Sequence, residues 1–377
     1  MSNYFSQYCV LLGSIEQFTY CRQAYLLEDL LARVKSLWNC TQLSDNELLD
    51  EISRLNQMPV DDTVKLAGNW LPYRYQPKHK RVHWLLPVGH ATEPFQDEYI
   101  SRCCQQLFNQ IFQPRTSLNG AIQQAKTLAD VQPAGFIFHL SRCGSTLISG
   151  CLSELATTCV FSEAPLLTEL LLDAQLTLDE QQNSLRAFIN LQAAAFSQRP
   201  QMIIKWNAWD IFRWQLIREL YPQVPVVFLV REPVEILASH QRMAGRHMSG
   251  DPSLVDINPV FISGRKTLLS FRSDVLAALL GEMSKFSSDS LVLRVDYRHL
   301  DAAQIRTISN HFGVFPDDQS FQQITRRLQF HSKMPGAAFS NDARAKQALF
   351  AVEDKATIEQ SLMPIYYQFL GCPKELA

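Results

Sequence analysis

The pattern of apolar and polar residues divides the chain about one third of the way along its length. In the first part, apolar residues recur at helical spacing over residues 16–38, and Ser44 or Asp45 could cap the helix that follows. Residues 68–100 are rich in aromatic residues, Pro and His and have no clear period. This pattern predicts a mainly helical accessory domain over residues 1–130, with an irregular insertion.

The second part alternates short apolar runs with helical stretches and begins after turn signals at residues 132–135. Residues 184–196 and 209–221 have helical spacing, and the runs around them are rich in Val, Ile and Phe. Apolar strands that alternate with helices predict an α/β domain over residues 131–377, with a parallel sheet covered by helices on both faces. The five predicted strands are residues 135–140, 157–162, 201–206, 224–230 and 290–296.

A length of 377 residues fits two domains, and the composition narrows the classes of partner. The net charge of −2 gives no bulk attraction to nucleic acid or to an anionic membrane, so any anion site must be local. No stretch approaches the ~20 apolar residues of a membrane span, and the first residues do not resemble a secretory signal. Nine cysteines without regular spacing predict reduced thiols in a cytoplasmic protein, and the adjacent Cys103 and Cys104 lack a CxxC partner for zinc.

Ligands of parallel α/β sheets bind at the carboxyl ends of the strands, so the residues after each predicted strand are the candidates. The sequence SRCGSTL follows the first strand. Gly144 permits a tight turn, while Ser145 and Thr146 fall where a helix N-terminus favours a phosphate. An ordinary capped turn has the same pattern, so the loop alone leaves both interpretations open. The loop residues are Ser141, Arg142, Cys143, Gly144, Ser145 and Thr146.

Charged residues also follow the second and third predicted strands. Glu163 precedes a helix start at Pro165, so it is either a partner of the helix dipole or, beside an anion, a group that handles a proton. Lys205 lies between apolar strand residues and a Trp, which favours a buried or site-facing position. Asn207 or Asp210 could cap the next helix.

A second candidate anion site follows the fourth predicted strand. Arg231 is the first residue after the strand, and Ser239 lies eight residues further on, a little over two helical turns away. Together they could bind a second phosphate. The alternative is an arginine that Glu232 or Glu235 neutralises.

Together, SRCGSTL and REPVEILAS resemble two signatures of the sulfotransferases that use 3′-phosphoadenosine 5′-phosphosulfate (PAPS), a family with the P-loop fold. The first signature holds the 5′-phosphosulfate, and the resemblance assigns residues 141–146 to it, with Arg142 at the usual basic position. The second signature binds the 3′-phosphate, and the resemblance assigns Arg231 and Ser239 to it. The resemblance covers residues 130–377 and implies a P-loop-type three-layer fold.

Two later segments resemble the family more loosely. VLRVDYRHL resembles a late strand whose tyrosine lies near the adenine, which implies that role for Tyr297. Residues 331–346 lie where the family has a basic, Gly-containing loop over the 3′-phosphate, which implies Lys333 and Gly336 as ligands. The full Arg-Lys-Gly pattern of the cytosolic branch is absent from this segment.

The sequence departs from the cytosolic branch at the catalytic base. That branch has a histidine two residues after the lysine of the third strand, whereas this chain has Asn207, which cannot accept a proton. SEAP resembles the branches that use a glutamate after the second strand. The resemblance therefore implies Glu163 as the base, Lys205 as its electrostatic partner and Arg142 as a donor to the leaving group. Three histidines are alternative bases: His139, His240 and His247.

The resemblance implies transfer of a sulfuryl group from PAPS to a hydroxyl or amine of a small-molecule acceptor, by in-line displacement. No metal is expected, because the loop lacks the lysine of nucleotide triphosphatases, which use Mg²⁺. The alternatives are a nucleotide-binding regulatory module without catalysis and a P-loop kinase-like phosphotransferase. No pattern indicates an oligomeric state. An acceptor pocket, or the packing of the first domain, could use the aromatic run that includes Trp70, Tyr73, Tyr75, His83 and Trp84.

Overall fold

The computed structural model contains two compact units, and the chain passes from one to the other five times. The first unit includes residues 164–200, which the sequence analysis places in the second domain. The change of unit at residues 131 and 132 lies at the boundary expected from the turn signals. The described residues are 4–60, 64–264, 266–330 and 349–371. The first unit is 1–91, 96–131 and 164–200, and the second is 92–95, 132–163 and 201–377.

Helices make up most of the first unit. The Ser44 hydroxyl accepts a hydrogen bond from the main-chain N–H of Glu47, and the Glu47 carboxylate accepts one from the Ser44 N–H. This capping box confirms the expected cap. The helices are α1 (Phe5–Gly13), α2 (Ile15–Arg22), α3 (Leu27–Trp38), α4 (Asp45–Leu55), α5 (Gln96–Cys104), α6 (Leu107–Ile111), α7 (Leu118–Ala125), α9 (Pro165–Leu171) and α10 (Leu178–Ala195).

The stretch expected to be irregular contains two strands of a three-stranded antiparallel sheet, so that expectation is wrong. Strands β1 (Leu71–Gln76), β2 (Arg81–Leu85) and β3 (Arg115–Ser117) lie in that order. Lys80, in the left-handed conformation at φ 46°, closes the β1–β2 hairpin after the short helix η1 (Pro77–His79). The sequence signal was alternation: buried Tyr75 lies between exposed neighbours.

A five-stranded parallel sheet forms the second unit, as the apolar runs predict. Its strand order is β5–β6–β4–β7–β8, and every neighbouring pair is parallel. The strands are β4 (Gly135–His139), β5 (Thr158–Ser162), β6 (Gln201–Lys205), β7 (Val226–Val230) and β8 (Val292–Asp296).

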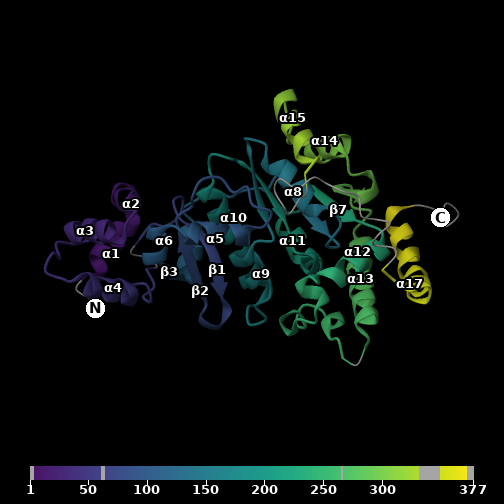
Figure 1. Ribbon diagram of the computed structural model, residues 1–377, viewed down its shortest axis with the longest axis horizontal. Coiled ribbons are helices and arrows are strands. Elements are labelled where there is room, and N and C mark those ends of the chain that lie inside the picture. The colour runs from purple at the N-terminus through teal and green to yellow at the C-terminus, as the bar shows by residue number, and fades with distance from the viewer. Residues whose placement is uncertain (1–3, 61–63, 265, 331–348, 372–377) are drawn as a thin grey trace. The chain divides into compact units, whose positions relative to one another are not determined.

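Helices cover both faces of this sheet, which confirms the three-layer α/β fold. One face buries aliphatic residues such as Ile137 and Val227 against α8 (Ser145–Ser153), α14 (Ala302–His311) and α15 (Asp318–Arg327). The alternate strand residues face the other way, where Phe138 and Phe228 pack on Trp214 at ring distances of 5.5 and 5.3 Å. That face carries α11 (Trp214–Leu220), α12 (Pro233–Arg242), α13 (Leu268–Lys285) and α17 (Val352–Leu370), and the last three of these lie side by side (Figure 1).

The strand order determines where a ligand can bind. From central β4 the chain moves toward the β5 edge, whereas from β7 it moves to β8 at the opposite edge. The loops that leave the carboxyl ends of β4 and β7 therefore diverge, and a crevice at this edge is the usual ligand site of open α/β sheets. Among the helices that the structure describes, none is long and apolar enough to cross a membrane.

Candidate functional site

The loop after β4 has an unusual backbone conformation. Ser141 and Arg142 have φ angles of 64° and 52°, and Glu163 at the end of β5 has φ 54°. Among the described residues, only two other non-glycine residues have a positive φ, Asn39 and Lys80. Left-handed non-glycine residues are strained and concentrate at functional sites. The strain in the second unit therefore lies at the carboxyl ends of β4 and β5.

Gly144 is required by both conformation and space. Its φ is +91°, and a Cβ at this position would lie 2.6 Å from Cδ2 of Tyr297. Tyr297 opens the short helix η6 (Tyr297–His299) directly after β8. The ring that the resemblance assigns to the adenine region thus packs on the glycine of the phosphate-type loop.

The loop leads into the N-terminus of α8, where Ser145 and Thr146 are both buried. The N–H groups of the first turn of a helix have no partner within the helix and favour an anion. The Cys143 side chain turns away into the core, where its thiol donates to the Leu229 carbonyl, and burial raises its pKa to about 12. Any contact of Cys143 with an anion must come from its main chain.

Lys205 is the cation beneath this loop. Its side chain is fully buried, with Nζ 3.4 Å from Oγ1 of Thr146 and 3.0 Å from Oε1 of Glu163. The ammonium also lies 4.7 Å from the centre of the Phe95 ring. The lysine at the end of β6 therefore links the helix N-terminus to the carboxylate at the end of β5.

Glu163 remains 26% exposed while it contacts two basic side chains. Burial alone would raise its pKa, but the Lys205 ammonium and the His139 ring outweigh that effect and hold the pKa far below its usual range. His139 Nδ1 accepts a hydrogen bond from the Ser141 N–H at 2.9 Å, so a neutral ring carries its proton on Nε2. That Nε2 lies 3.5 Å from Oε1 of Glu163.

Arg142 extends from the loop toward the segment after α12. One of its guanidinium nitrogens donates to the Met243 carbonyl at 2.7 Å. Burial lowers the pKa of Arg142, and the Glu163 charge opposes this shift. Arg142 and Glu163 therefore act on each other electrostatically across the ends of β4 and β5.

Arg231, at the end of β7, makes a buried ion pair with Glu235. This is the neutralising partner that the sequence left as an alternative. The guanidinium also donates to the Arg142 carbonyl at 3.4 Å and stacks on Tyr297, 4.1 Å from the ring centre. Ser239 lies one turn beyond Glu235 on the same face of α12 and is half-buried.

The structure thus brings most predicted site residues to one edge of the sheet. Arg231 and Tyr297 meet over the loop, while Lys205 and Glu163 meet beside it. Lys333 and Gly336 lie outside the described residues. Sequence reasoning missed Phe95 and the Met243 carbonyl, whose positions depend on chain segments far from the loops they contact.

The other candidates have more ordinary surroundings. Asn207 and Asp210 cap the short helix η2 (Ala208–Arg213) in a reciprocal box, as one sequence interpretation proposed. His240 and His247 are buried, and His240 Nδ1 accepts from the Gly245 N–H at 3.1 Å. In the part of the chain that the structure describes, no group of His, Cys, Asp and Glu side chains could hold a metal ion.

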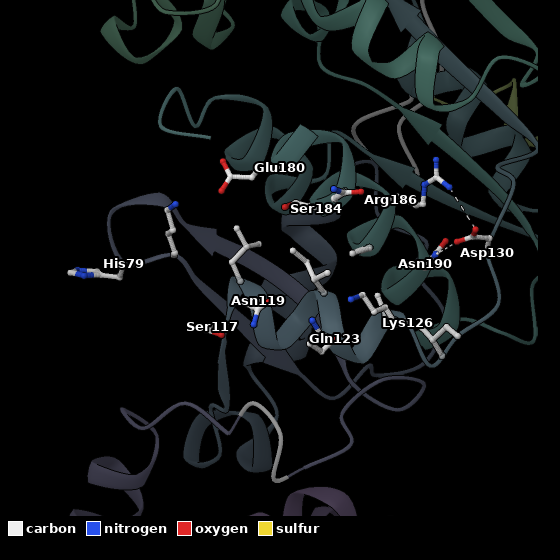
Figure 2. Close-up of a pocket in the computed structure, with 17 residues that line it drawn as sticks. His79, Ser117, Asn119, Gln123, Lys126, Asp130, Glu180, Ser184, Arg186 and Asn190 are labelled. Carbon is white, nitrogen blue, oxygen red and sulfur yellow. Dashed lines mark hydrogen bonds and ion pairs between the residues drawn. The ribbon is translucent and has the colours of Figure 1, made fainter. Parts of the chain in front are cut away.

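A separate groove of about 960 Å³ lies in the first unit, between α7 and α10 (Figure 2). Its lining combines polar residues such as Asn119 and Glu180 with apolar residues such as Ile122. At one end Asp130 accepts a hydrogen bond from Asn190 at 2.9 Å and lies 3.7 Å from Arg186. None of the predicted site residues lines this groove.

No family model and no curated protein matches the sequence. Among solved structures, a mouse sulfotransferase complexed with PAP is 11% identical over 66% of this chain and 88% of its own, with a TM-score of 0.38. The sulfotransferase STF1 of Mycobacterium tuberculosis is 16% identical over 67% of this chain and 81% of its own, with a TM-score of 0.39. The sulfotransferase STF9 of Mycobacterium avium is 12% identical over 67% of this chain and 80% of its own, with a TM-score of 0.43.

Proposed function

We propose that the protein is a sulfotransferase that moves a sulfuryl group from PAPS to a hydroxyl or amine of a small-molecule acceptor. The observation that carries this proposal is the convergence of three cations on one edge of the sheet. Arg142 and Arg231 follow β4 and β7, Lys205 ends β6, and the N-terminus of α8 lies among them. This arrangement suits a donor with phosphate groups at two positions.

The chemistry requires stabilisation of a leaving phosphate. In an in-line displacement, negative charge grows on the bridging oxygen between sulfur and the 5′-phosphate, as it does in phosphoryl transfer. Arg142 belongs to the loop and Lys205 lies against its end at Thr146, so both can receive that charge together with the main-chain N–H groups of α8. The acceptor proton needs a base at the same edge, for which the family resemblance suggests Glu163.

The loop favours this donor over Mg–ATP. A nucleotide triphosphatase loop places its lysine directly before the Ser/Thr at the start of the helix. Here Gly144 precedes Ser145, and the nearby ammonium comes from β6 instead, where Lys205 is held by Glu163. Arg231 supplies a second cationic site, for which a donor with only a 5′-phosphate chain has no use.

The direct experiment is a transfer assay with the purified full chain. PAPS with a labelled sulfuryl group is incubated with phenols, sugars, lipids and small amines, and labelled products are separated. We expect transfer to at least one acceptor class, with the bisphosphate as co-product. A protein that binds adenosine 3′,5′-bisphosphate but transfers to none of these would favour the non-catalytic regulatory module. A protein that binds no bisphosphate would overturn both.

A further inference from the structure

Several buried polar atoms beside the site have no hydrogen-bond partner among the described residues. They are Oδ1 of Asp210, Nε1 of Trp209 and both ring nitrogens of His247. These three residues are 1%, 6% and 2% exposed, respectively. The centres of the Trp209 and His247 rings lie 5.6 Å apart, and the Glu163 charge acts on both Asp210 and His247. Unsatisfied buried polar groups are costly, and a cluster of them indicates a missing polar partner.

The Asp210 carboxylate is held by one oxygen only. Oδ2 accepts hydrogen bonds from the main-chain N–H of Asn207 at 2.9 Å and from its side-chain amide at 3.3 Å. Oδ1 makes no hydrogen bond in the described structure. An oriented carboxylate with one unused oxygen has the geometry of a general base. Asp210 follows Lys205, the last residue of β6, by five residues and lies in η2.

We propose that Asp210 accepts the proton of the acceptor group, and that Glu163 instead fixes Lys205. This inference rests on the proposed sulfotransferase function. The Trp209 N–H and the His247 ring nitrogens supply further hydrogen-bonding groups for the acceptor. Asn207, in the position where the cytosolic branch has its histidine, acts as a positioning residue for the base.

The electrostatics of the two carboxylates agree with this division of roles. Burial raises the pKa of Asp210 to about 7; the Glu163 charge adds to the shift, while the Asn207 hydrogen bonds and Arg246 oppose it. A base is most effective when its pKa lies near the working pH, and the pKa of Glu163 lies far below it. The other charged or titratable groups nearby are His139 on β4, His247 on η3 (Arg246–Met248), and Arg272 on α13, which donates to the Met248 carbonyl.

The proposed step is balanced. The O–H bond of the acceptor breaks and its proton moves to Oδ1 of Asp210 as the acceptor oxygen forms a bond to sulfur. The bond between sulfur and the bridging oxygen breaks, and its electron pair stays on the 5′-phosphate of the bisphosphate product. Asp210 then releases the proton to solvent. No metal or redox partner is needed.

The test compares Asp210→Asn with Glu163→Gln in the full chain, using the acceptor class found in the transfer assay. The asparagine keeps a carbonyl oxygen for the Asn207 hydrogen bonds but cannot take a proton. We expect kcat to fall about 10²- to 10⁴-fold, with bisphosphate affinity unchanged as evidence of a folded donor site. Asp173→Asn is the matched control, because Asp173 is a buried carboxylate of the first unit that accepts from Tyr75.

The pH profile separates catalysis from structure. In the natural protein kcat/KM should rise with pH through a pKa near 7. This rising limb of the pH profile should be absent in Asp210→Asn. In Glu163→Gln the limb should remain but shift to lower pH, because the Glu163 charge no longer raises the pKa of Asp210. A limb that persists in Asp210→Asn and disappears in Glu163→Gln overturns the inference. Carboxyl ¹³C NMR tests the inference without turnover. A carboxyl resonance that titrates near pH 7 and is lost in Asp210→Asn supports the inference, whereas titration of the Asp210 carboxyl near pH 4 overturns it. If the Asp210 carboxyl titrates near pH 7 but the natural protein transfers to no acceptor, the proposed function fails and not the assignment of Asp210.

Discussion

Nζ of Lys205 lies 3.0 Å from Oε1 of Glu163, and the lysine side chain is fully buried. Removing one partner of a buried ion pair leaves an uncompensated charge, which typically costs about 3–5 kcal/mol. We therefore expect Glu163→Gln to lower the free energy of unfolding by roughly that amount. Urea denaturation at pH 7 measures it.

The exposed pair Lys266–Asp274 provides the control for this prediction. Its partners are 47% and 45% exposed, so Asp274→Asn should cost less than about 1 kcal/mol. The double variant Glu163→Gln/Lys205→Met should be more stable than Glu163→Gln alone, because it removes both charges. A single Glu163→Gln variant as stable as the natural protein would contradict the buried pair.

The same pair predicts a dependence on pH. The pKa of Glu163 is depressed in the folded protein, so its contribution to stability is present above the ordinary glutamate pKa of 4.5 and is lost as pH falls through the lower folded value. The stability difference between the natural protein and Glu163→Gln should therefore shrink as pH falls below about 5.5. Denaturation curves from pH 3 to 8 test this, and a difference that grows in acid would refute it.

Asp210 should affect stability in the opposite sense. Its pKa is raised in the folded protein to about 7, so the folded state binds the extra proton. The contribution is fully present below the unfolded value near 3.8 and is lost as pH rises through 7. Asp210→Asn should remove this loss, and its stability relative to the natural protein should improve from pH 5 to pH 8. Parallel stability curves for the two proteins would contradict the raised pKa.

Gly144 tests the packing of the loop under Tyr297. Gly144→Ala introduces a Cβ 2.6 Å from the ring at a φ of +91°, so it should destabilise the protein and weaken bisphosphate binding at least tenfold. Gly313→Ala is the control, because Gly313 has a φ of +67° but nothing within 4 Å of the added atom. It should cost about 1–2 kcal/mol for the backbone alone and leave binding unchanged. Equal loss of binding in both variants would show that the contact between residue 144 and the Tyr297 ring does not determine bisphosphate binding.

Arg231 and Glu235 test the second phosphate site. Arg231→Ala should weaken binding of adenosine 3′,5′-bisphosphate about tenfold or more, because a charge-assisted contact is lost. Glu235→Gln should tighten binding, because it removes the carboxylate that now neutralises Arg231. Titration calorimetry measures both, with the exposed Arg326→Ala on α15 as the control. Unchanged affinity in Arg231→Ala and Glu235→Gln would exclude this pair from the site.

The sequence predicts the sheet well because its strands are nearly continuous apolar runs, and each of the five runs forms a strand of the second unit. It also places Arg142, Glu163, Lys205 and Arg231 at the carboxyl ends of those strands. The sequence left open whether Glu232 or Glu235 pairs with Arg231, and the structure shows Glu235. What the sequence could not predict is contact between distant segments, such as that of Tyr297 with Gly144.

Other differences also come from tertiary context. The β1–β2 hairpin was missed because aromatic and Pro residues masked a short alternating pattern. The Asp210 cap was foreseen as one option, but its unused oxygen and raised pKa depend on burial by segments that follow much later. Lone carboxylates look alike in a sequence, and only their surroundings separate a base from a cap.

The most direct measurement of the central claim is the change in melting temperature with three nucleotides, because a ligand that binds the native state stabilises it. Adenosine 3′,5′-bisphosphate should raise the melting temperature clearly more than adenosine 5′-monophosphate, which lacks the 3′-phosphate, and more than Mg–ATP. Arg231→Ala should remove most of the difference between the bisphosphate and the monophosphate. Stabilisation by Mg–ATP with none by the bisphosphate would contradict a donor site built for PAPS.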